Sequence, residues 1–136
     1  MDEVNIDGIV LTPLKNIILP KGNILHGIKK DDNGFAGFGE AYFSTVNYNE
    51  VKGWNYHREM TLNLVVPIGK VTFIIYDDRK RSNSKGSFFK VSLSTSNYKR
   101  LTIPPKLWVA FKGEDFDTNL ILNIANIVHD ENEIKK

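Results

Sequence analysis

The stretch REMTLNLVVPIGKVTFIIYDD, Arg58–Asp78, decides the fold class of this chain. It contains two runs rich in Val, Ile, Leu, Phe and Thr, 61–68 and 70–77, and such residues suit the pleated surface of a strand. Gly69 lies between the runs, and glycine supplies the backbone freedom that a tight turn needs. Neither run sustains the apolar period of an amphipathic helix. The stretch therefore predicts a strand, a turn and a second strand.

The same pattern continues outward in both directions. Short apolar runs are separated by clusters of Gly, Asn, Asp, Pro and Ser, and no segment favours a helix. This spacing predicts an all-β sandwich or barrel, and the length suits a single domain over residues 1–136. The candidate strands are 5–12, 16–19, 23–30, 34–46, 50–58, 61–68, 70–77, 87–94, 99–104, 107–113 and 119–128.

The connecting segments carry their own signals. Asn33-Gly34 has the composition of a hairpin turn. Pro104 and Pro105 have no backbone N–H to donate to a sheet, so they mark an edge or a corner. The C-terminal HDENEIKK is acidic and then basic, and we expect a short solvated helical turn or a frayed tail, covering about 127–136.

Composition excludes several classes of protein. The formal net charge is only +2 and the lysines are spread along the chain, so no nucleic-acid footprint is expected. The absence of cysteine excludes a disulfide framework and a thiolate nucleophile. The N-terminus lacks the pattern of a secretory signal, and the longest apolar run is too short for a membrane span. We therefore expect a cytoplasmic protein that contacts neither nucleic acid nor membrane.

Familiar catalytic motifs are absent from the sequence. No G-x-S-x-G elbow, no G-x-x-x-x-G-K-[ST] phosphate loop and no G-x-G-x-x-G opening a helix occurs. The histidines His26, His57 and His129 are far apart, although His57 and Glu59 would share one face of a strand and could begin a metal site. We expect no metal site.

One cluster and its downstream neighbours carry a resemblance. The cluster is KGWNYH, Lys52–His57, and the fragments G-K-V, D-D-R…S…G, L-S…N and I-P-P…F follow it in order. From about Val4 to Glu133 the chain resembles the dTDP-4-dehydrorhamnose 3,5-epimerase family of nucleotide-sugar epimerases and the related sugar 3,4-ketoisomerases. The resemblance rests on the ordered set of fragments, because each one alone is weakly specific.

The resemblance implies a fold and a chemistry. The fold would be a double-stranded antiparallel β-helix, the cupin jelly-roll barrel, usually dimeric and binding a thymidine diphosphate sugar in its mouth without metal or organic cofactor. In the family a histidine removes a proton beside the 4-keto group of the sugar, and a tyrosine returns one. A base that titrates near neutrality suits this step, because the ketone acidifies the neighbouring C–H.

This chain departs from the family pattern at positions that carry its chemistry. Where the epimerases read Arg-Gly-Leu-His-Tyr-Gln, Asn55 stands in place of the catalytic histidine, and an amide is not a base near neutral pH. The ketoisomerases have two histidines in this segment, and His57 matches the second. Asn123 aligns with the proton-donating tyrosine, and Val109 aligns with a further family histidine.

In one interpretation the protein is an enzyme. His57 takes over the proton transfer, and Asn55, two residues away on the same strand face, binds the 4-keto oxygen or its enolate. Tyr42 is the candidate second acid; Tyr48 and Tyr56 are alternatives, although strand parity puts Tyr56 on the face opposite His57. The expected substrate-binding residues are Lys52 as the diphosphate partner, Trp54, Arg58 and Asn123.

The enzyme would be an epimerase or ketoisomerase that acts on a dTDP-4-keto-6-deoxyhexose in surface-polysaccharide sugar biosynthesis. The alternative is a non-catalytic cupin that binds sugar nucleotides, in which His57 is an ordinary strand histidine hydrogen-bonded inside the mouth. A third interpretation is a structural domain whose mouth is closed by side chains. Trp54 and Trp108 are core or interface aromatics, or else they stack on a nucleotide base.

Overall fold

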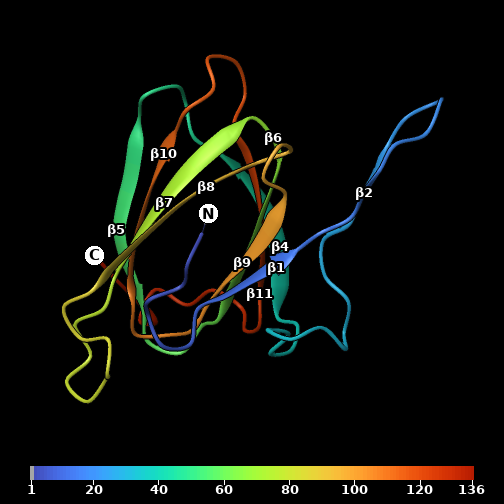
Figure 1. Cartoon of the computed structure of the whole chain (residues 1–136). Helices are drawn as coiled ribbons and strands as arrows, with labels where there is room; N and C mark the ends of the chain where they lie inside the picture. Colours follow the sequence, from blue (N-terminus) through green and yellow to red (C-terminus); the bar gives the residue numbers. More distant parts are fainter. Residues whose placement is uncertain (1) are drawn as a thin grey trace.

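The computed structural model describes residues 2–136, which form a barrel of two five-stranded antiparallel sheets and a separate two-stranded hairpin (Figure 1). No helix occurs among these residues, so the predicted all-β class is confirmed. The strands are β1 (Val10–Pro13), β2 (Asn16–Ile17), β3 (Ile24–Leu25), β4 (Glu40–Thr45), β5 (Val51–His57), β6 (Leu62–Ile68), β7 (Lys70–Tyr76), β8 (Phe88–Ser94), β9 (Lys99–Ile103), β10 (Trp108–Gly113), β11 (Leu120–Ala125) and β12 (Ile134–Lys135).

The strand order within each sheet is not the order along the chain. One sheet runs β1-β9-β6-β11-β4 and the other β12-β5-β10-β7-β8. Consecutive strands therefore often lie in different sheets, as a jelly roll requires. The predicted strand, turn and strand of 58–78 are confirmed as β6 and β7, but these two strands belong to opposite sheets. The turn at Gly69, with φ 84°, carries the chain across the barrel.

Two of the predicted connections have different outcomes. Pro104 and Pro105 lie between β9 and β10, where the chain passes from one sheet to the other, so the predicted corner is confirmed. The hairpin predicted at Asn33-Gly34 is wrong, because this turn lies in a loop between β3 and β4. The loop is held by the fully buried Arg100, whose guanidinium donates to the carbonyl of Asn33 at 3.0 Å.

The core lies between the two sheets. Inward-facing side chains of both sheets form one buried cluster that includes Phe73, Ile75, Leu101 and Ile103. Alternate residues of β6, β7, β8 and β9 supply most of this cluster, as expected for sheets with one buried face. β4 and β5 contribute no residue to this cluster, and the site described below lies on their side of the barrel.

The C-terminal segment differs from the expectation. Residues 128–132 are exposed and lead into a turn at 131–133, as expected, but β12 then pairs antiparallel with β5, so that Ile134 lies opposite His57 and Lys135 opposite Tyr56. Glu133, just before β12, is buried with 6% of its surface exposed. The expected frayed end is wrong, because charge composition alone does not report a partner strand, and β5 offers a free edge here.

Candidate active site

A cavity of about 220 Å³ opens between the two sheets on the side of β4 and β5. Apolar side chains from β6, β7, β10 and β11 form part of its wall, and polar side chains from β4, β5 and β11 form the rest. A few polar groups on an apolar wall are typical of small-ligand sites. The apolar residues are Leu62, Leu64, Phe73, Val109, Phe111 and Ile121, and the polar residues are Tyr42, Ser44, Lys52, Asn55, His57 and Asn123.

A bulge in β5 brings three of these polar side chains together. In the pairing with β10, Asn55 lies opposite Val109 and Lys52 opposite Phe111, so two residues of β5 face one residue of β10. Strict alternation would place Lys52 on the face opposite Asn55 and His57. The extra residue moves Lys52 to the cavity side, and all three line the cavity.

Gly53 makes this bulge possible. Its φ is 126°, and a Cβ at this position would lie 2.7 Å from the carbonyl oxygen of Val109 and 2.8 Å from the Cα of Ala110. An L side chain is therefore excluded both by backbone conformation and by the neighbouring strand. Glycine at position 53 is therefore required for the bulge that brings Lys52, Asn55 and His57 to the cavity.

His57 and Glu133 form a buried pair at the wall of this cavity. The Nδ1 of His57 lies 2.6 Å from Oε1 of Glu133. The other carboxylate oxygen, Oε2, accepts from the backbone N–H groups of Glu59 at 2.8 Å and Met60 at 2.9 Å. A carboxylate fixed in this way makes Nδ1 the protonated nitrogen, which leaves Nε2 as the basic nitrogen of the ring.

The environment of Glu133 favours its ionised form. Burial alone would raise the pKa of its carboxyl, but the hydrogen bonds from the Glu59 and Met60 backbone and from His57 outweigh burial and lower that pKa below its ordinary value. The group therefore stays an acceptor at neutral pH. It also stabilises the imidazolium that forms when His57 accepts a proton.

Tyr42 and Asn123 face the cavity from the other sheet. Tyr42 on β4 lies opposite Asn123 on β11, and the Asn123 Nδ2 donates to the Tyr42 hydroxyl oxygen at 2.9 Å. Because this oxygen accepts from the amide, the Tyr42 proton is available for donation. Asn123 is buried, while Tyr42 is 41% exposed and reaches the mouth.

Lys52 is the cation at the mouth of the cavity. Its Nζ donates to the backbone carbonyl of Thr45 on β4 at 2.6 Å, so it bridges the two sheets where the cavity opens. It forms no ion pair with a carboxylate in the part of the chain that the structure describes. Its charge is therefore free to bind an anion.

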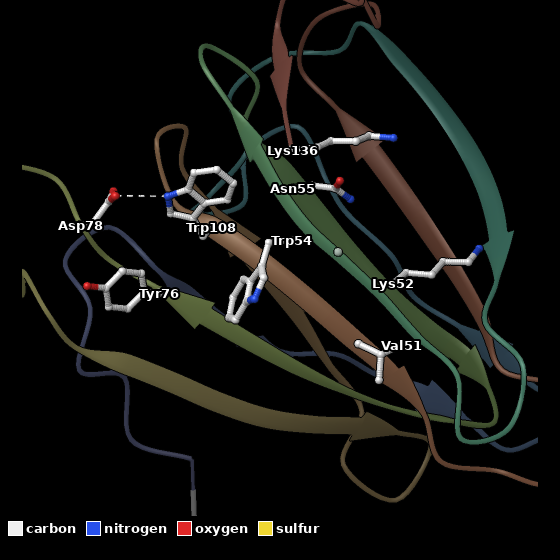
Figure 2. A pocket seen from close by; sticks show the side chains of 9 residues that line it. Val51, Lys52, Trp54, Asn55, Tyr76, Asp78, Trp108 and Lys136 are labelled. Atoms are coloured by element: carbon white, nitrogen blue, oxygen red, sulfur yellow. Dashed lines mark hydrogen bonds between the residues drawn. The ribbon is translucent and has the colours of Figure 1, made fainter.

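Two of the expected substrate-binding residues lie elsewhere. Figure 2 shows Lys52 and Asn55 on one side of β5 and Trp54 on the other, beside Trp108. Trp54 thus lines an outer hollow of about 870 Å³. Arg58 is exposed at the end of β5 and lines neither cavity.

The remaining aromatic predictions have clear outcomes. Tyr56 lies on the outer face, with its ring centroid 5.1 Å from that of Trp108, so its predicted place opposite His57 is confirmed. The Lys135 ammonium lies 5.4 Å from the Tyr56 ring centroid and adds a cation–π contact. Tyr48 packs on Phe116 outside the cavity lining. Of the candidate tyrosines, Tyr42 faces the cavity that His57 lines.

No His, Asp and Glu cluster suited to a metal occurs in residues 2–136. The His57 Nδ1 is taken by Glu133, while Glu59 contributes only its backbone N–H to that carboxylate. His26 and His129 lie outside the cavity lining.

Glu133 is the residue that sequence reasoning missed. It lies 76 positions from His57 in the chain, within a segment whose charge pattern indicates a solvated tail. No local motif marks it as buried. The alignment of β12 with the edge of β5 is what brings its carboxylate to the histidine.

Comparison with solved structures gives the family. A dTDP sugar isomerase from Desulfovibrio desulfuricans superposes with a TM-score of 0.94 and 34% sequence identity, over 97% of this chain and 85% of that one. The chain belongs to the dTDP-sugar isomerase family. Its barrel is therefore the cupin jelly roll that the resemblance implied.

More distant members of this fold include sugar-nucleotide enzymes of two reaction types. A double mutant of ChmJ, a 3′-monoepimerase from Streptomyces bikiniensis in complex with dTDP, matches with a TM-score of 0.89 and 13% identity over 100% of this chain and 72% of that one. A mutant of the 3,4-ketoisomerase QdtA from Thermoanaerobacterium thermosaccharolyticum, in complex with TDP-4-keto-6-deoxyglucose, matches with a TM-score of 0.78 and 18% identity over 95% and 87%. At these identities the likeness shows the fold.

Among curated proteins, a relative from Haloferax volcanii described as a "probable low-salt glycan biosynthesis epimerase" is 29% identical over 91 residues, which are 66% of this chain. The matched part spans 58% of that relative's length. No protein-family model matches the chain. Residues 2–136 contain no helix able to span a membrane.

Proposed function

We propose that this protein is a nucleotide-sugar epimerase or ketoisomerase that moves protons on a dTDP-4-keto-6-deoxyhexose. The observation that carries the proposal is the buried pair of His57 and Glu133 at the wall of a cavity whose other sheet presents Tyr42. Family membership supports the substrate class, because the similar solved enzymes are dTDP-sugar enzymes.

The first step is proton abstraction by His57. Its Nε2 takes the proton from the carbon beside the 4-keto group, and the C–H electron pair forms the enolate. Glu133 holds the Nδ1 proton and balances the charge of the imidazolium. Asn55, on the same strand face, donates an amide N–H to the enolate oxygen, which lowers the energy of the negative charge that develops there.

The second step is return of a proton to carbon. Tyr42 stands on β4 of one sheet and His57 on β5 of the other, so the two groups approach the sugar from different walls. A proton given by the Tyr42 hydroxyl would arrive on the face opposite the one that His57 deprotonated, and this inverts the carbon. The Asn123 amide already donates to the oxygen that carries the negative charge after transfer.

Lys52 would hold the diphosphate. It lies at the open end of the cavity, next to the catalytic strand face, and its ammonium has no carboxylate partner among the described residues. A sugar that reaches inward toward His57 leaves its diphosphate at this end. A lysine binds phosphate as a point charge rather than through a bidentate fork.

The proposal also covers the oligomeric state of the protein and its biosynthetic role. We propose a homodimer, supported by the hairpin of β2 and β3, which projects from the barrel and exposes Ile17, Ile18, Leu19 and Ile24 (Figure 1). Exposed apolar side chains on a projecting segment favour a protein partner. A role in surface-polysaccharide sugar biosynthesis is supported by the curated epimerase relative. A cytoplasmic location stays a prediction from the sequence.

The reaction is tested by deuterium exchange. We expect that the protein, incubated with dTDP-4-keto-6-deoxyglucose in deuterated water, incorporates deuterium at C3 or C5 if it epimerises and at C3 or C4 if it isomerises, and NMR assigns the carbon. His57→Asn should abolish the exchange, whereas His129→Asn, outside the cavity lining, should leave it unchanged. No exchange by the folded wild-type protein would refute the catalytic proposal.

The same experiment separates the enzyme from a binding cupin. The replacement of the family's histidine and tyrosine by Asn55 and Asn123 is the observation that favours loss of catalysis. Calorimetry with dTDP would then show binding although no carbon exchanges. If dTDP does not bind, the remaining interpretation is a structural domain that neither binds nor converts a sugar nucleotide.

A further inference from the structure

We propose that the outer hollow beside Trp54 binds the base of the sugar nucleotide, while the sugar lies in the cavity between the two sheets. This inference rests on the proposed function, because it places the other half of the same substrate. It assigns a role to Trp54 and Trp108, which the proposed proton transfers do not use.

The cavity that His57 lines is too small for the whole substrate. Its volume is about 220 Å³. Sites for drug-sized ligands have volumes of about 300–1,000 Å³. A nucleotide sugar carries a diphosphate, a pentose and a base in addition to its hexose, so the space between the sheets suits the hexose alone. The nucleoside must therefore bind outside this cavity.

The outer hollow adjoins this cavity around the edge of β5. Lys52 and Asn55 line both spaces, and the hollow has a volume of about 870 Å³. β12 pairs with β5 only at Tyr56 and His57, so no strand in the described part of the chain covers the same edge at 51–55. A ligand can therefore pass over this edge from one space to the other.

Two lysines flank the passage over this edge. Figure 2 shows Lys136 on the same side of β5 as Lys52 and Asn55, and all three residues line the hollow. Neither lysine forms an ion pair with a carboxylate among residues 2–136. Lysine ammonium groups bind phosphate as point charges. Two of them at the crossing suit the diphosphate, which joins the sugar to the nucleoside.

The outer side of β5 offers aromatic rings to the base. Trp54, Trp108 and Tyr76 line the hollow, and Trp54 is 41% exposed, so a ligand can reach its ring. Nucleobases stack on aromatic side chains, because every base has a π-face. Asp78 lines the same hollow and accepts from the Trp108 indole N–H at 3.3 Å, and its carboxylate has further lone pairs for an N–H of the base. Aromatic rings beside an acceptor are the chemistry that recognises a nucleobase.

Tryptophan fluorescence tests this subsite in the unmodified protein. The chain contains two tryptophans, and both line the hollow. Titration with dTDP should therefore change the tryptophan emission along a saturating curve. Inorganic pyrophosphate has no base to stack, so it should bind without this change. A constant emission while calorimetry shows that dTDP binds would overturn the inference.

Trp54→Ala separates the base from the phosphates. Calorimetry should show about 10-fold weaker binding of dTDP, the loss expected for one stacked base, and unchanged binding of pyrophosphate. Trp54→Phe keeps an aromatic ring and should retain most of the affinity for dTDP. Phe38→Ala is the matched control, because Phe38 is 67% exposed and lines neither space.

The outcomes distinguish this inference from the proposed function. Equal affinity of the wild-type protein and Trp54→Ala for dTDP would refute the base subsite and leave the proposed reaction standing. A change of mass in light scattering with no change in dTDP affinity would identify the hollow as a protein interface and also refute the subsite. If Trp54→Ala does not fold, the fluorescence titration decides. Failure of dTDP to bind the wild-type protein refutes both proposals, whereas weaker binding by Trp54→Ala without deuterium exchange in the wild-type protein refutes only the catalytic one.

Discussion

At the scale of single residues, the chemistry depends on a histidine held by a carboxylate from the far end of the chain. The Glu133 carboxylate uses one oxygen for the His57 ring and the other for two backbone N–H groups. Both carboxylate oxygens accept hydrogen bonds, and these three bonds hold the carboxylate in its orientation toward His57. Glu133 is therefore a positioning residue for His57.

Glu133→Gln tests this role. The amide offers an N–H in place of an acceptor at Nδ1, so the ring would be held in the wrong tautomer, and kcat for deuterium exchange should fall about 100-fold or more. The KM for the sugar nucleotide should stay nearly unchanged, because Glu133 does not line the cavity. Glu131→Gln, at an exposed neighbouring position, is the matched control. Equal exchange rates in the two variants would exclude a positioning role.

Asp77 makes stability depend on pH. Hydrogen bonds from the Arg79 guanidinium lower the pKa of this buried carboxyl strongly; burial opposes them, and the Ser82 and Ser84 hydroxyls, each at 2.6 Å, add to the lowering. A lowered folded-state pKa gives stability that is present above the unfolded pKa and is lost as pH falls through the folded one.

Asp77→Asn should therefore destabilise the protein by about 3 kcal/mol at neutral pH, because it leaves the Arg79 guanidinium and the Ser82 and Ser84 hydroxyls without their charged acceptor. Urea unfolding at several pH values measures the effect. The difference between the wild-type protein and the variant should shrink in strong acid, where Asp77 becomes protonated. Asp31→Asn, at an exposed position, is the control, and a difference that does not change with pH would contradict the assignment.

At the scale of elements, β5 determines which side chains meet. Its bulge against β10 moves Lys52 to the face of Asn55 and His57, and its free edge accepts β12, which brings Glu133. The same strand presents Trp54 and Tyr56 on its outer face. The irregular strand β5 thus brings Lys52, Asn55 and His57 together, and its neighbour β10 supplies Val109 and Phe111 to the apolar wall.

Gly53→Ala should disrupt this strand. The added methyl group would press on the Val109 carbonyl and on Ala110 at a φ of 126°, so we expect a loss of more than about 2 kcal/mol in unfolding free energy and weaker dTDP binding. Gly86→Ala also has a positive φ, 88°, but no atom within 4 Å of the new Cβ. This control should lose only about 1 kcal/mol, the cost of the backbone conformation. Equal losses would show that β10 does not constrain the bulge.

At the scale of the whole molecule, the hairpin of β2 and β3 is the part that the barrel does not use. It pairs only with itself, and Ile18 at its tip is 70% exposed. A two-stranded hairpin by itself is marginally stable in water, so a partner surface would stabilise it. This supports the proposed dimer.

Light scattering tests the dimer directly. The wild-type protein should have the mass of two chains, and Ile18→Lys should shift it toward one, since a charge cannot be buried unpaired at an apolar interface. Val128→Lys, which changes a residue that is 66% exposed outside the hairpin, should leave the mass unchanged. A monomeric wild-type protein would refute the proposal.

Local sequence properties predicted the all-β class, most strand positions and the shared strand face of Asn55 and His57. These follow from local properties: β-branched and aromatic runs favour strands, Gly and Pro end them, and alternation places Asn55 and His57 on one side. The resemblance of the ordered fragments also gave the family, which the comparison with solved structures supports.

The other features of the site depend on contacts between strands far apart in the chain. The bulge that turns Lys52 inward depends on the register against β10, and the role of Glu133 depends on the edge of β5 that β12 joins. The hydrogen bond between Asn123 and Tyr42 depends on the pairing of β11 with β4. Each of these features joins residues far apart in the chain, and local preference carries no information about such partners, because pairing and burial are set by the packing of the two sheets.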